Sequence, residues 1–68
     1  MKGLYIGKIV HFVDEHGRDH AAIVCAIHAG SQSTVSLTAF FYGMQYVPTV
    51  PYSEIPSPLT WHWIEEER

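Results

Sequence analysis

Five histidines stand out among the side chains that could carry chemistry, because the whole sequence has only 68 residues. They are spread along the chain at His11, His16, His20, His28 and His62. Imidazole can bind a metal ion, and it can hydrogen-bond a partner or a ligand phosphate. The spacing matches no zinc signature and we expect no acidic or thiolate ligand beside the histidines, so we predict no metal site. We interpret them as polar points on a half-buried face.

Catalytic groups are scarce in this sequence. A hydrolase needs a nucleophile with a base, or paired carboxylates, at a rigid site. Asp14, Glu15 and Asp19 cluster around a predicted hairpin tip, which is typical of a solvated turn. The single cysteine, Cys25, lies in an apolar run and is predicted as a small buried core residue. We therefore expect no enzymatic activity and no cofactor.

The tripeptide Trp61-His62-Trp63 has two interpretations. In the structural one, both indoles close the bottom of a small core. In the functional one, one indole is a stacking platform for a planar ring such as a nucleobase. In this functional interpretation, Tyr46, Tyr42 or Phe40 would lie near the indole. Arg18 or Lys8 would bind a phosphate of the ligand.

Charge and composition exclude several classes of partner. The net charge is −3, and the four basic residues are scattered, so they form no stripe for a long nucleic acid. No apolar run approaches the roughly 18 residues of a membrane span, and the first residues do not resemble a secretory signal. A lone cysteine favours a reducing compartment. We expect a cytoplasmic protein.

The elements that position these residues are predicted to be strands. Residues 21–27 include no charged or amide side chain, and β-branched residues alternate with small ones, which indicates a strand. Because this strand is apolar on both faces, we expect it at the centre of a sheet. A chain of 68 residues has little material to cover both faces, so we expect a second copy to cover one of them.

The remaining pattern predicts an all-β fold in a single small domain, 1–68, with a lead-in at 1–7 and an acidic tail at 65–68. No helix longer than a turn is expected. Pro48 confines the fourth strand to an edge or a bulge. The fold is either a small five-stranded SH3-like or OB-like barrel, or a curved antiparallel sheet completed by homo-oligomerisation. The expected strands cover residues 8–13, 20–28, 35–41, 46–50 and 60–64.

Loop lengths predict the register. A first hairpin loop of two or four residues around His16 and Gly17 places Phe12 opposite Ala21 and Val10 opposite Ile23. An odd loop at 29–33 then pairs three more positions: Ile27 with Val35, Cys25 with Leu37, and Ile23 with Ala39. One face therefore reads Val10, Phe12, Ala21, Ile23, Cys25, Ile27, Val35, Leu37, Ala39 and Phe41. The other face of the sheet is predicted to carry Ile9, His11, Val13, His20, Ala22, Val24, Ala26, Ser36, Thr38 and Phe40.

Four segments resemble a pattern found in small proteins of bacteriophages and prophages. They are GKIVHFV at 7–13, AAIV at 21–24, VSLTAF at 35–40 and TWHW at 60–63. The phage pattern has GKIVHYV, a Gly-Arg turn, AAIV, VNLxVF and a terminal TWHWPE in the same order. The chain departs from it at Ser36, where the pattern has Asn, and at Ile64, where it has Pro.

The resemblance implies a phage protein in the cytoplasm of a bacterial host, where small proteins include sponges that bind nucleotide-derived immune signals without cleaving them. By this analogy of context we expect a non-enzymatic homo-oligomeric sponge with a pocket between subunits. The alternative is a protein-interaction module, either a virion accessory protein or an inhibitor of a host protein. The expected ligand-binding residues are His11, Arg18, His20, Tyr46, Trp61 and His62.

Overall fold

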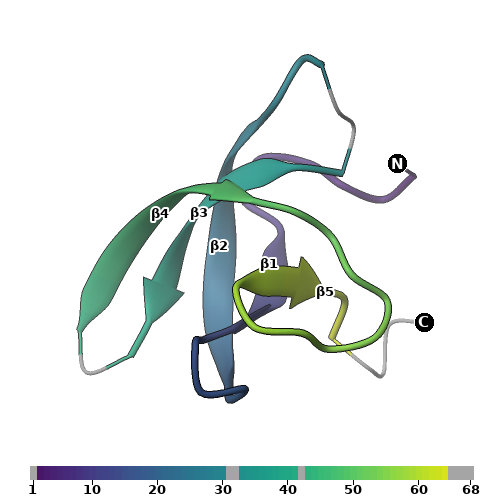
Figure 1. The fold of residues 1–68 in the computed structure, drawn as a ribbon. Helices are drawn as coiled ribbons and strands as arrows, with labels where there is room; N and C mark the ends of the chain where they lie inside the picture. Colours follow the sequence, from purple (N-terminus) through teal and green to yellow (C-terminus); the bar gives the residue numbers. More distant parts are fainter. Residues whose placement is uncertain (1, 31–32, 42, 65–68) are drawn as a thin grey trace.

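The computed structural model describes residues 2–30, 33–41 and 43–64, and within these ranges the regular structure consists of strands alone. The strands are β1 (Ile9–Val13), β2 (Asp19–Ile27), β3 (Val35–Phe40), β4 (Met44–Val50) and β5 (Thr60–His62), as labelled in Figure 1. The prediction of an all-β chain is confirmed.

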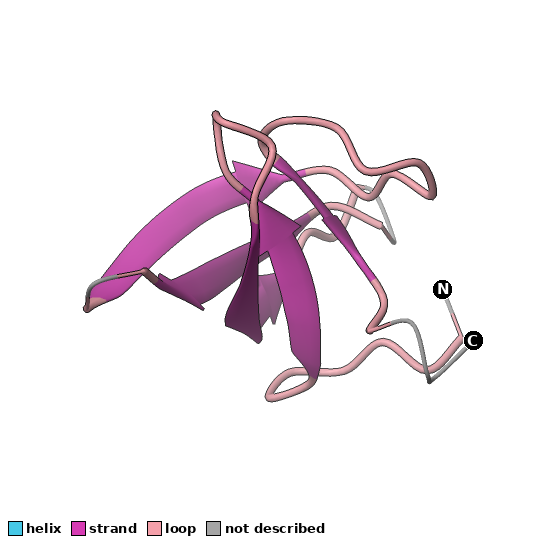
Figure 2. Ribbon diagram, turned by 90° about the horizontal axis from the view of Figure 1, so that it is seen from below, coloured by secondary structure: helices cyan, strands magenta, loops and turns pink. Residues whose placement is uncertain are grey.

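The five strands form one antiparallel sheet in the order β4-β3-β2-β1-β5. The sheet curls into a half-barrel, which is visible in two perpendicular views (Figures 1 and 2). β2 is the middle strand, as its apolar sequence predicts. β4 is an edge strand, and its register shifts opposite Ser36. Pro48 is therefore accommodated as expected, because a residue without an N–H is tolerated at an edge or a bulge.

The segment that follows β4 joins the two edges of the curl. Tyr52 forms an isolated parallel bridge with Trp61 of β5. The backbone N–H of Trp61 donates to the carbonyl of Pro51 at 3.0 Å, and that of Ser53 donates to the carbonyl of Trp61 at 3.0 Å. These hydrogen bonds close the half-barrel locally around Trp61.

The core lies on the concave side of the sheet. Trp61 is fully buried there, its Nε1–H donates to the carbonyl of Ser33 at 2.7 Å, and its ring contacts the edges of Tyr52 and Trp63. This burial agrees with the structural interpretation of Trp61, whose indole has no face open for stacking, whereas Trp63 is only partly buried. The buried cluster contains Val10, Phe12, Ala22, Val24, Val35, Leu37, Ala39, Val50 and Trp61.

The predicted register of the first hairpin is wrong by one residue. Phe12 lies opposite His20, and Val10 lies opposite Ala22. The N–H of Asp14 donates to the carbonyl of Arg18 at 2.9 Å, so the loop between them holds three residues rather than two or four. Gly17 adopts a φ of 82°, which a three-residue loop of this kind requires. The odd loop turns each side chain of this part of β2 to the other face.

A β-bulge explains why the second hairpin is predicted only in part. Ile27 pairs with Val35 as expected, but the register shifts between Val24 and Ala26, and Val24 rather than Cys25 lies opposite Leu37. Cys25 is therefore exposed, and the prediction that it is a core residue is wrong. Ala21 and Ile23 also leave the predicted inner face, whereas His20, Ala22 and Val24 join it.

The convex side of the sheet carries exposed apolar side chains in the single chain. Met44 and Tyr46 of β4 are 76% and 60% exposed, and Phe40 of β3 and Ile9 of β1 are also exposed. Ala21 and Cys25 of β2 lie between them and are exposed as well. The second face of the central strand is thus left uncovered by the chain's own residues within the described part.

Candidate functional site

The six residues predicted to bind a ligand lie in four places. Arg18 and His20 line a pocket at the tip of the first hairpin. His11 and His62 lie on the convex side, directly opposite one another on β1 and β5. Two residues stand apart from both sites, namely Trp61 in the core and Tyr46 on the exposed side of β4. A single site made of all six residues does not form within one chain.

The pocket has a volume of about 540 Å³, which lies in the range of small-molecule sites. It lies between the β1–β2 hairpin, the start of β4 and the residue that precedes β5. One part of its wall is apolar, made of Phe12, Phe41, Val47 and Leu59. The rest is polar, made of Asp14, Glu15, His16, Arg18, His20 and Gln45. A planar ring with polar substituents fits such a lining.

His20 connects the two parts of the pocket. Its Nε2 lies 2.7 Å from Oδ2 of Asp14, and its ring packs edge-on against Phe41, with centroids 4.4 Å apart. The β1–β2 register places His20 on the concave side beside Phe12, whereas sequence reasoning placed it beside His11 on the other face. The prediction that His11 and His20 lie near each other on one face is therefore wrong, because the three-residue hairpin loop shifts the register by one residue.

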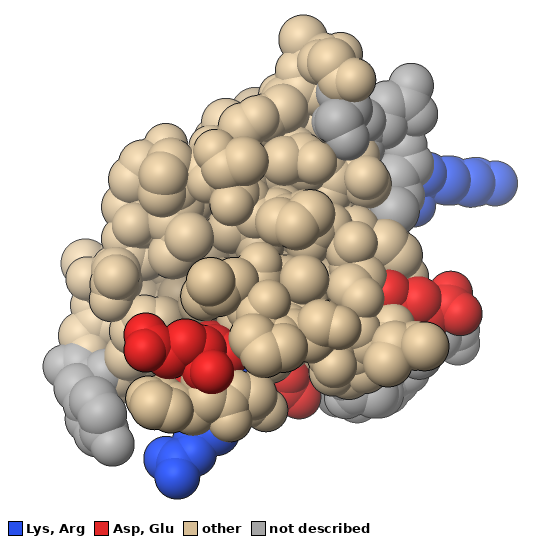
Figure 3. Space-filling view, viewed as in Figure 1, with Lys and Arg blue, Asp and Glu red and all other residues tan. Residues whose placement is uncertain are grey.

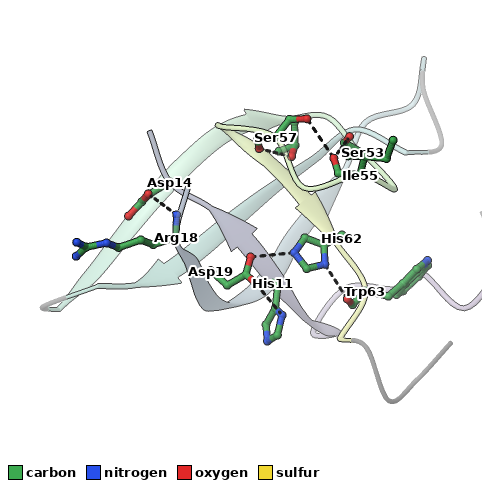
Figure 4. Close-up of polar contacts among 10 residues, drawn as sticks. His11, Asp14, Arg18, Asp19, Ser53, Ile55, Ser57, His62 and Trp63 are labelled. Atoms are coloured by element: carbon green, nitrogen blue, oxygen red, sulfur yellow. Dashed lines mark hydrogen bonds and ion pairs between the residues drawn. The ribbon is translucent and has the colours of Figure 1, made fainter. Parts of the chain in front are cut away.

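Asp14 is held in place by its own loop. Its Oδ1 accepts hydrogen bonds from the backbone N–H groups of His16 at 2.8 Å and Arg18 at 2.9 Å. Figure 4 shows the hydrogen bond from Arg18. The hydrogen bond with His20 and the backbone N–H groups lower the pKa of Asp14 to about 2, since all of them favour the carboxylate. Asp14 is therefore an ionised, fixed acceptor that orients His20 at neutral pH.

A second group of polar residues, which we name the His–Asp–His cluster, comprises His11, Asp19 and His62. Nε2 of His62 lies 2.9 Å from Oδ1 of Asp19, and Nδ1 of His11 lies 3.9 Å from Oδ2 of the same carboxylate (Figure 4). The two imidazole rings are 5.4 Å apart at an angle of 80°. Asp19 is on β2 and His62 on β5, so their side chains meet across β1.

Sequence reasoning missed Asp19 as a member of this cluster. The sequence pattern places Asp19 at a solvated hairpin tip, but the three-residue loop makes it the first residue of β2, opposite Val13. The expectation that no acidic residue accompanies the histidines is therefore wrong. The signal that could have found it is Gly17, whose position fits the three-residue loop that shifts β2 by one residue.

The other two histidines have simpler surroundings. His28 follows β2, and its Nε2 lies 3.1 Å from Oγ of Ser36 and 3.1 Å from the carbonyl oxygen of Pro48. These contacts link the β2–β3 hairpin to β4. His16 is exposed in the first hairpin loop, at the rim of the pocket.

The chain matches no protein-family model, and comparison with curated proteins and with solved structures found no match either. Within the described residues, no helix is long and apolar enough to span a membrane.

Proposed function

We propose that this chain is a small non-enzymatic binding protein of phage type, which sequesters a nucleotide-derived signalling molecule of the host's immune defence. The observation that carries the proposal is the pocket of about 540 Å³, in which an aromatic wall adjoins a polar rim. The resemblance to phage proteins supplies the context, and the pocket supplies a place for the ligand.

The lining of the pocket favours a ligand with a planar ring. Phe41 is half-buried and lies beside Phe12, with ring centroids 6.0 Å apart, so this wall offers apolar contact to a base. Arg18 at the rim can bind a phosphate through two N–H groups. Both contacts are non-covalent, which suits a protein that retains its ligand without cleaving it.

The carboxylates of the rim restrict the ligand further. Asp14 and Glu15 line the same pocket as Arg18, and carboxylates repel phosphate but accept hydrogen bonds from hydroxyl and amino groups. The pocket therefore favours a nucleotide that presents ribose hydroxyls or an exocyclic amine beside its phosphate. A bare polyphosphate would meet two acidic side chains for one arginine.

Assembly into oligomers is part of this proposal. Much of the convex face consists of exposed Ile9, Phe40, Met44 and Tyr46, and large exposed apolar patches often mark interaction surfaces. In Figure 3, which has the view of Figure 1, the visible charged groups are few and lie in the lower and right-hand parts of that side of the molecule, and most of the rest of the visible surface is uncharged. We propose that copies of an SH3-like barrel pack through the convex face, in the cytoplasm of the bacterial host.

A protein-interaction module is the second candidate. The observation that favours it is the edge strand β4, whose Met44 and Tyr46 are largely exposed beside an unpaired strand edge. Edge strands can accept a strand of another protein. In this case the chain would be a virion accessory protein or an inhibitor that caps a host protein.

Ligand binding separates these two functions. The pure protein is incubated with a cyclic dinucleotide or with ADP-ribose, separated from free ligand and heated, and the released nucleotide is identified by mass. We expect intact nucleotide, and we expect Arg18→Ala to retain at least about tenfold less, whereas the exposed Lys2→Ala retains the wild-type amount. Cleaved nucleotide would indicate an enzyme. No retained nucleotide, with a stoichiometric protein partner captured instead, would favour the second candidate.

A further inference from the structure

We propose that the His–Asp–His cluster binds a divalent transition-metal ion of the Zn²⁺ type. His11, Asp19 and His62 each offer one ligand atom, and these atoms all lie within 4.8 Å of one another. Two imidazoles and one carboxylate form a common ligand set for such ions. The sequence-based expectation against a metal assumed that no acidic ligand accompanies the histidines, and Asp19 supplies that ligand.

The hydrogen bonds of His62 fit a metal ligand. Its Nδ1 lies 2.9 Å from the carbonyl oxygen of Trp63, and its Nε2 lies 2.9 Å from Oδ1 of Asp19. Both oxygens are acceptors, whereas a neutral imidazole has a single N–H to donate. The ring therefore either carries two N–H groups, or donates Nδ1–H to Trp63 and presents Nε2 to a cation. The second arrangement is usual for metal-bound histidines, whose other nitrogen donates to a carbonyl or a carboxylate.

Metal binding requires the three ligand atoms, which lie within 4.8 Å of one another, to move closer to a tetrahedral arrangement. Atoms bound to one tetrahedral Zn²⁺ lie about 3.4 Å apart, given bond lengths of about 2.0–2.1 Å. The 2.9 Å between Nε2 of His62 and Oδ1 of Asp19 must therefore widen slightly. His11, whose Nδ1 lies 3.9 Å from the other oxygen, Oδ2, must move towards the remaining two ligand atoms. The side chains of His11 and Asp19 are 26% and 45% exposed, so both have room to rotate. His62 is fully buried and fixes the position of the site.

The ligand types select among cations. Mg²⁺ and Ca²⁺ prefer oxygen ligands, whereas imidazole nitrogen suits zinc, nickel and copper. Three protein ligands leave a fourth position for water or a partner's side chain. The ion would also link β5 and β2 across β1, and β5 is a strand of three residues whose ladder hydrogen bonds go to β1. Metal binding is thus expected to stabilise the fold.

The chain contains an internal control. His20 and Asp14 form another histidine–carboxylate pair, with 2.7 Å between Nε2 and Oδ2. Among the described residues, no third histidine, cysteine or acid joins this pair within ligand distance. A metal that merely prefers any imidazole beside a carboxylate would bind both pairs, whereas the proposed site is confined to the three-ligand cluster.

The test uses the full-length chain, stripped with a chelator and titrated with Zn²⁺ by calorimetry and by thermal unfolding. We expect one Zn²⁺ per chain and a raised Tm. Since loss of a partner that only orients a ligand weakens metal binding about 10- to 100-fold, His11→Gln and Asp19→Asn should weaken it by at least about 100-fold. Both positions are partly exposed, and circular dichroism checks that the variants fold.

The controls His20→Gln and His16→Gln should bind Zn²⁺ like the wild type. In histidine ¹⁵N spectra, Zn²⁺ should shift Nδ1 of His11 and Nε2 of His62. The proposal is overturned if the stripped, folded protein takes up no Zn²⁺ at a large molar excess. It is equally overturned if His11→Gln and Asp19→Asn bind Zn²⁺ as tightly as the wild type.

Discussion

Asp19 of β2 and His62 of β5 are joined across β1 by a contact of 2.9 Å between Oδ1 and Nε2, although 43 residues separate them in sequence. His62 is fully buried, whereas the carboxylate is 45% exposed, so Asp19 brings a negative charge from the surface to an enclosed imidazole. The pair links β5 to the central strand β2 across β1, which lies between them.

Removal of this carboxylate is expected to destabilise the fold even without metal. Asp19→Ala leaves a buried ring nitrogen of His62 without its acceptor, which costs about 1–3 kcal/mol of unfolding free energy. Urea denaturation in the presence of a chelator measures this loss. Glu15→Ala, in an exposed loop position, is the control and should change stability by less than about 0.5 kcal/mol. Equal stabilities of the two variants would contradict the role of Asp19.

Asp14 is expected to make stability depend on acid pH. Its pKa is lowered from 3.8 in a model compound to about 2 in the fold, so its contribution is complete above about pH 4. That contribution is lost as the pH falls from about 4 towards 2, because the unfolded chain then binds the proton first. The stability difference between wild type and Asp14→Asn should therefore shrink over this window. A difference that stays constant from pH 5 to pH 2 would contradict the assignment.

Gly17 is expected to be the least replaceable residue of the first hairpin. With a φ of 82°, it lies in the left-handed region, where a side chain costs about 1–2 kcal/mol. Gly17→Ala should lower the unfolding free energy by that amount, although a Cβ there meets no other atom within 4 Å. Gly30→Ala, where φ lies outside this region, is the matched control. Urea denaturation compares the two variants.

Trp61 and Tyr46 are both predicted from sequence to bind a ligand, but truncation of the two side chains should change stability by very different amounts. Trp61→Ala empties the centre of the core and should cost about 3–5 kcal/mol, enough to unfold a domain of this size. Tyr46→Ala removes a side chain that is 60% exposed and should change monomer stability by less than about 0.5 kcal/mol. Thermal unfolding followed by circular dichroism checks both. A folded Trp61→Ala with wild-type Tm would contradict the core assignment.

The convex face gives a prediction about assembly. If copies pack through it, Met44→Lys with Tyr46→Lys should lower the mass measured by light scattering to that of one chain, because buried charge at an apolar contact is costly. Glu54→Lys, on the exposed loop after β4, should leave the mass unchanged. A wild-type protein that is already a monomer at high concentration would contradict the shared interface.

The sequence predicted the strands well because their signals are local. β-branched runs, turn residues and Pro48 are sufficient to indicate five strands, the central place of β2 and the edge position of β4. The face of the sheet on which each side chain of β2 lies was not predictable in the same way. It depends on a single residue more or less in the first hairpin loop and on the single extra residue at the bulge by Cys25. Each one-residue change moves the side chains beyond it to the opposite face of the sheet. The cluster of Asp19 with His11 and His62 follows from that facing, so it was missed.

The bulge in β2 also has a practical consequence. It turns the sulfur of the only cysteine of the chain outwards, 3.2 Å from Oγ1 of Thr38, in the middle of the convex face. A thiol-reactive dye can therefore be attached to one defined position of the central strand without any engineered mutation. The rate at which the dye couples reports directly on whether another molecule shields that part of the sheet.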